Sequence, residues 1–107
     1  MDNEELVKEI NINLPIAAAP GISLDELQQL VATYVNGLIQ KDFQRLIYVL
    51  YRVDVSESKL KQLLKENPAA NAGDIIAGLI IERQMQKIKT RRLFSKPNNE
   101  FDEEEKW

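Results

Sequence analysis

Cysteine and histidine are both absent from the 107 residues of this sequence. Without cysteine, the chain forms no disulfide, no thiolate nucleophile and no thiolate metal site. Without histidine, Ser-His-Asp and Cys-His catalytic arrangements are excluded, and so are His-ligated zinc sites. Acid–base chemistry near neutral pH would need a carboxylate, lysine or tyrosine with a strongly shifted pKa. We therefore expect that the protein is not an enzyme, binds no metal and needs no cofactor.

Long apolar runs are also absent. The longest is Ile75–Ile81, which Gly78 interrupts, whereas a membrane span needs about 18 residues or more. The first residues, Met1–Glu5, are acidic, whereas a secretory signal has a basic start and then an apolar run. We expect a cytoplasmic protein that has no membrane segment.

The residues that are present are typical of one globular domain, with 44% hydrophobic and 29% charged residues. We predict an all-α fold, namely a compact, irregular four-helix bundle over residues 23–95. Residues 1–22 are predicted to form an extended N-terminal arm, and residues 96–107 a disordered, acidic C-terminal tail.

A capping box marks the start of the first predicted helix. Ser23 can cap the helix, and Glu26 three residues later can reach back to it. Apolar residues then recur at helical spacing as far as Leu38. Asn36 and Gly37 are expected either to kink or end this helix, or to permit close packing.

Three further helices are predicted, over residues 42–53, 57–66 and about 72–93. Asp42 and Ser56 can cap the first two of them. The helix over 42–53 has apolar residues on several sides, so we expect it to be the central, most buried helix.

The N-terminal arm is predicted from its prolines. Pro15 and Pro20 push the residues before them towards extended conformations. Ile10 and Ile12 alternate with polar neighbours, which permits a short strand over residues 9–12.

Charge is unevenly distributed, although the net charge is only −3. Residues 83–99 contain six basic residues and no acid, whereas residues 100–107 contain five acids and one lysine. The basic stretch can dock a protein, contact nucleic-acid phosphates, or simply be a solvated helix end that complements the helix dipole. The candidate interaction residues on it are Arg83, Lys87, Lys89, Arg91 and Arg92.

The acidic tail contains two large apolar residues, Phe101 and Trp107, which complete the set of candidate interaction residues. A short acidic segment cannot bury such side chains by itself. Three interpretations remain open: a recognition segment, a segment that folds back onto the basic helix end, and a solubilising end.

Together these observations predict a non-enzymatic protein-interaction module. Its partner is another protein or a second copy of the chain, because the apolar residues of helix 72–93 cover an arc wide enough to serve a homodimer. Nucleic-acid binding through residues 83–96 is the alternative, which the acidic overall charge disfavours. A second alternative is a small enzyme that uses carboxylates such as Asp54, Asp74 or Glu82.

Overall fold

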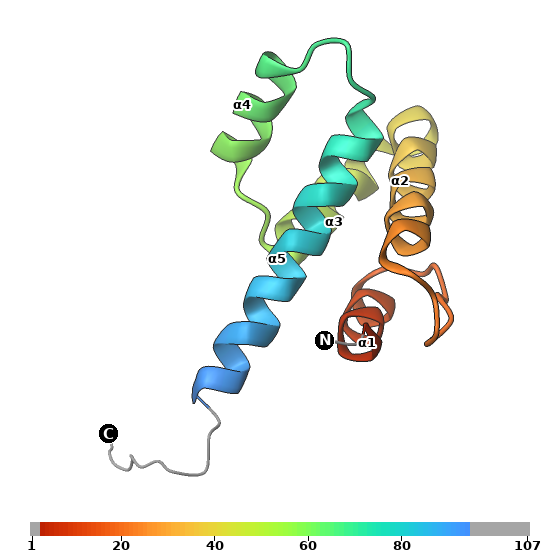
Figure 1. The fold of residues 1–107 in the computed structure, drawn as a ribbon. Coiled ribbons are helices and arrows are strands. Elements are labelled where there is room, and N and C mark those ends of the chain that lie inside the picture. The colour runs from red at the N-terminus through yellow and green to blue at the C-terminus, as the bar shows by residue number, and fades with distance from the viewer. Residues whose placement is uncertain (1–2, 95–107) are drawn as a thin grey trace.

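The computed structural model describes residues 3–94, which fold into five α-helices (Figure 1). The helices are α1 (Glu4–Asn13), α2 (Leu24–Lys41), α3 (Phe43–Val53), α4 (Glu57–Glu66) and α5 (Ala72–Phe94). No residue in this range forms a β-strand, so the all-α prediction is confirmed. The predicted tail, residues 96–107, lies outside the described residues.

The N-terminal segment differs from the prediction, because residues 4–13 form α1 rather than an extended arm or a short strand. Leu6, Val7 and Ile10 are all buried. A helix places these three side chains on one face, whereas a strand would point Leu6 and Val7 in opposite directions. The described part of the chain therefore contains five helices instead of four, and Pro15 follows a helix instead of shaping an arm.

The segment between α1 and α2 returns along α1. The Asn11 side chain donates to the Ala18 carbonyl oxygen at 2.9 Å and accepts from the Ala18 N–H at 2.8 Å. Ala17 takes a left-handed conformation, with φ of 50°, at this reversal. The result is that Leu14 and Ala18, which flank the turn, are both buried.

The capping box of α2 is confirmed. The Glu26 N–H donates to Ser23 Oγ at 3.1 Å, and the Ser23 N–H donates to Glu26 Oε1 at 3.2 Å. Asn36 and Gly37 do not end the helix, which continues to Lys41.

Asn36 lies against the start of α5. Its Nδ2 donates to Asn71 Oδ1 at 3.2 Å. A Cβ added to Gly73 would lie 2.3 Å from Asn36 Oδ1, whereas a Cβ added to Gly37 would have nothing within 4 Å. The start of α5 thus approaches α2 closely, and Gly73 rather than Gly37 is the glycine that permits this contact.

The central helix of the bundle is α5, which contacts all four other helices and has its largest interface with α2. Its buried residues are Gly73, Ile76, Ala77, Leu79, Ile80, Ile81, Gln84 and Ile88. The wide apolar arc of this helix is therefore covered by helices of the same chain.

The prediction that α3 is the most buried helix is wrong. Only Leu46, Val49 and Val53 of α3 are buried, and they lie on one face of the helix. The opposite face remains exposed, because α3 packs on α1, α2 and α5 from one side only. Apolar residues on several sides of a helix are therefore buried in α5 but partly exposed in α3.

One polar side chain lies inside the core. Gln84 on α5 is completely buried, and neither its Nε2 nor its Oε1 has a hydrogen-bond partner among residues 3–94. An unsatisfied buried amide destabilises the folded state by about 1–3 kcal/mol.

We expect Gln84→Met to raise the free energy of unfolding by about 1–3 kcal/mol, since methionine fills a similar volume without unsatisfied polar atoms. Urea or thermal unfolding measures the change. Gln40→Met, at an exposed position of α2, is the control and should shift stability by less than about 0.5 kcal/mol. A less stable Gln84→Met variant would show that the amide is satisfied in solution.

The contact between Asn36 and Gly73 gives a second prediction. Gly73→Ala should displace the Asn36 side chain and break its hydrogen bond to Asn71, a loss of about 1 kcal/mol that the higher helix propensity of alanine partly offsets. The same substitution made in an Asn36→Ala background should cost markedly less, because the colliding atoms are gone. Equal effects in the two backgrounds, measured by urea unfolding, would contradict the close approach.

Candidate functional site

An apolar groove with a volume of about 330 Å³ lies between α3 and α4, and we call it the α3–α4 groove. Its apolar lining comes from both helices and the joint between them: Ile47, Leu50, Tyr51, Val55, Leu60 and Leu64. Glu57 and Lys61 also line it, and they form an ion pair at 3.1 Å. The groove is therefore apolar inside and carries a neutralised pair of charges.

The groove continues into an exposed apolar patch on α3. Phe43, Ile47, Tyr48 and Tyr51 are 58%, 53%, 55% and 85% exposed. Their spacing places them next to one another on the helix surface. Gathered apolar side chains of this size on a protein surface are typical of interaction sites.

The groove lies between two helices that pack mainly on other neighbours. No residue of α4 is buried, and the helix packs on α5 rather than on α3. Leu60 and Leu64 are half-buried and face the groove. The apolar sides of α3 and α4 thus line one hollow without closing it.

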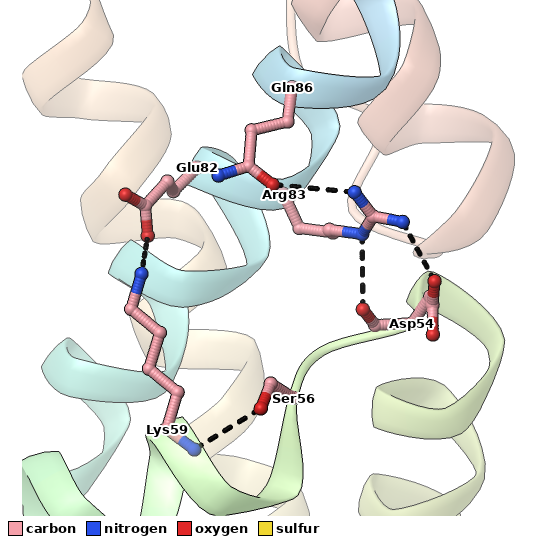
Figure 2. Close-up of polar contacts among 6 residues, drawn as sticks. All are labelled: Asp54, Ser56, Lys59, Glu82, Arg83 and Gln86. Atoms are coloured by element: carbon pink, nitrogen blue, oxygen red, sulfur yellow. Dashed lines mark hydrogen bonds and ion pairs between the residues drawn. The ribbon is translucent and has the colours of Figure 1, made fainter. Parts of the chain in front are cut away.

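An arginine on α5 fixes the joint between α3 and α4 (Figure 2). Asp54 ends α3 in a left-handed conformation, with φ of 64°. Arg83 Nε donates to the Asp54 carbonyl oxygen at 3.1 Å, and its Nη2 donates to Asp54 Oδ2 at 2.8 Å. The same guanidinium donates to Gln86 Oε1 at 3.3 Å. One side chain thus holds both the backbone and the carboxylate of the turning residue.

A second ion pair ties α4 itself to α5. Lys59 Nζ lies 3.0 Å from Glu82 Oε1 (Figure 2). Ser56 caps α4 by accepting a hydrogen bond from the Lys59 N–H at 3.2 Å. Together with the Arg83 contacts and the packing of Leu60 against the core, these interactions hold α4 beside the groove.

The candidate carboxylates do not form a catalytic pair. Asp54 and Glu82 line the same cavity of about 340 Å³ between α4 and α5, but each is paired with a base of its own. The hydrogen bond and charge of Arg83 lower the pKa of Asp54, which opposes the raised pKa that a general acid needs at neutral pH. Asp74 lies apart, in the first turn of α5. Within residues 3–94, no group of three or more acids has an arrangement that could hold a metal ion.

The predicted basic surface is largely neutralised by the chain's own acids. Arg83 is paired with Asp54, as described above. Arg91 lies 2.8 Å from Glu9 on α1, and Glu9 raises the pKa of the Arg91 guanidinium.

The remaining candidates of the basic stretch differ from one another. Arg92 forms an ion pair with Glu5, again on α1. Lys87 is half-buried and Lys89 is exposed. Two of the five bases thus fasten α1 to the end of α5, which sequence reasoning did not foresee. Phe101 and Trp107 lie outside the described residues.

None of the five described helices is long and apolar enough to cross a membrane. Comparisons of the chain with protein-family models, with curated proteins and with solved structures found no match.

Sequence reasoning missed the α3–α4 groove. The signal was present, because the apolar residues of 43–51 cover more than one face of a helix. We interpreted that breadth as burial, since a helix apolar on many sides is commonly a core helix. A core helix and a surface helix differ in the number of helices that pack around them, and this number is a property of the tertiary fold.

The Arg83–Asp54 pair predicts a pH dependence of stability. Asp54→Asn removes the ion pair but keeps a residue that tolerates the left-handed conformation. Because Arg83 lowers the pKa of Asp54 in the folded state, the stabilisation is present above the unfolded pKa and lost as the pH falls through the folded pKa. We expect the variant to unfold at a lower temperature than the unmodified chain at neutral pH, and the difference to vanish between about pH 5 and pH 2.

Arg83→Gln is the matched variant and should show the same pH dependence, since it removes the other partner of the pair. A difference in unfolding temperature that stays constant with pH would contradict an electrostatic role for Asp54.

Proposed function

We propose that this protein is a non-enzymatic interaction module that binds an apolar segment of a partner protein in the α3–α4 groove. The observation that supports this proposal is the exposure of Phe43, Ile47, Tyr48 and Tyr51 directly beside the groove. Burying these side chains against a partner would remove apolar surface from water, which is the main driving force of association.

The shape of the site favours an amphipathic helix as the bound segment. A hollow between two helices accepts the apolar face of a third, with anchors three and four residues apart. Tyr48 and Tyr51 are suited to such an interface, because tyrosine offers a large contact area, few rotatable bonds and a hydroxyl for hydrogen bonding.

Charge plays a minor part at this surface. Residues 42–66 contain five bases and four acids, so α3 and α4 present a nearly neutral face. Affinity would thus come from apolar burial and depend weakly on salt, whereas phosphate binding depends steeply on it. The pairing of Arg83, Arg91 and Arg92 with carboxylates gives the nucleic-acid alternative no further support.

A second copy of the chain remains the other partner class. Its contact would involve the same α3 patch, since the apolar arc of α5 is buried within one chain. Sedimentation of the purified protein distinguishes this case from a partner of different sequence.

Substitution of Tyr51 tests the groove. Tyr51 is the most exposed aromatic residue of α3, so Tyr51→Ala should leave the fold intact. We expect it to weaken partner binding by about tenfold or more, as for a central interface residue that contributes over about 1.4 kcal/mol. The measurement is capture of the partner from native lysate by the full chain and by the variant, followed by titration of the identified partner.

Ile12→Ala is the control, because Ile12 is another large hydrophobic residue, 66% exposed, on a different helix, α1. It should leave the affinity unchanged. Equal affinities of the Tyr51→Ala and Ile12→Ala variants would place the binding site elsewhere.

A further inference from the structure

Residues 95–107 of the same chain offer an occupant for the α3–α4 groove. We propose that this segment lies in the groove with Trp107 as its apolar anchor, and that it competes there with the partner. The proposal rests on the groove being the binding site argued above. It is supported by the reach of the segment, by the order of its charges and by the chemistry of the groove.

The segment is long enough to reach the groove from the end of α5. Glu82 is level with the start of α4, because it pairs with Lys59. Phe94, the last described residue, lies 12 residues further along α5, or about 18 Å along the helix axis. The 13 residues that follow span up to about 45 Å when extended. Trp107 can therefore pass the joint at Val55 and still enter the groove.

The order of charged and apolar residues along the segment fits the path from the end of α5 to the groove. Five acids at positions 100–105 precede Trp107, so they would cross the surface between the end of α5 and the groove. Lys87 lies there, close enough to Asp54 to contribute to lowering the pKa of that carboxyl. Within residues 3–94, Lys87 has no hydrogen-bonded ion-pair partner of its own, whereas Arg83 does. An acidic segment would supply that partner.

The groove itself does not repel an acidic segment. Of the acids near it, Glu57 is neutralised by Lys61 and Asp54 by Arg83. Most of its lining is apolar, and Tyr51 is one of the lining residues. A tryptophan ring buries well against such a surface and keeps its indole N–H available to a polar neighbour.

Trp107 reports its own position, because it is the one tryptophan in the sequence. We expect its fluorescence emission in the native full chain to be shifted to shorter wavelength than in urea and to be protected from a soluble quencher such as acrylamide. Ile47→Asp and Tyr51→Asp, both at exposed positions, should shift the emission to longer wavelength and remove the protection. Ile12→Asp should leave both unchanged, and circular dichroism confirms that each variant keeps its helices.

Three outcomes would overturn the proposal. The first is a native emission identical to that in urea, which means that Trp107 is not docked. The second is a shifted emission that does not respond to Ile47→Asp or Tyr51→Asp, which places Trp107 on another surface. The third is protection that disappears on dilution, which assigns the groove to the segment of a second copy. Lys87→Gln should cause a smaller loss of protection from the quencher than Ile47→Asp or Tyr51→Asp, and this result would support the proposal.

Partner binding and the intramolecular contact are tested by different measurements. Trp107→Ser removes the anchor and should increase capture of the partner, because the competing occupant is weakened. If Trp107 emission responds to the groove variants but no partner binding depends on Tyr51, the intramolecular contact stands and the interaction module does not. If partner binding depends on Tyr51 but Trp107→Ser has no effect on it, the module stands and the competition does not.

Discussion

The packing of every other helix on α5 is the constraint from which the rest of the structure follows. α1, α2, α3 and α4 all contact this helix, and its buried residues lie on more than one face. A single helix can pack against so many neighbours only if its apolar residues are not confined to one stripe. The four peripheral helices then need to be apolar on one side only, and the excess on α3 stands out as surface that the fold does not use.

The proposed binding surface depends on this arrangement through few contacts. α4 buries no side chain, and its joint to α3 turns on a left-handed aspartate held by one arginine of α5. Helix positions in most bundles are fixed by interdigitating apolar side chains. Here the position of one wall of the α3–α4 groove depends on the half-buried Leu60, which packs against the core, and on exposed ion pairs, which contribute little and are screened by salt.

Much of the fold was predictable because local signals decide it. Ser23, Asp42 and Ser56 cap the helices that follow them, and capping depends only on neighbouring residues. α1 was missed because the prolines after it outweighed the helical spacing of Leu6, Val7 and Ile10. The basic candidates were found as residues but not as pairs, since Glu5 and Glu9 meet them only in the folded chain. The groove was hidden for the same reason, because exposure of α3 depends on which helices are left to cover it.

The ion pairs between α1 and the end of α5 join residues that are 82 and 87 positions apart. Chains are synthesised from the N-terminus, and contacts between distant residues form late and slow the folding of a domain. α1 and α2 therefore leave the ribosome before the helix on which both of them pack most extensively, and the core is completed only when residues 72–94 are available. During that interval Leu6, Val7 and Ile10 are available to chaperones, which makes the order of synthesis itself a hazard for this fold.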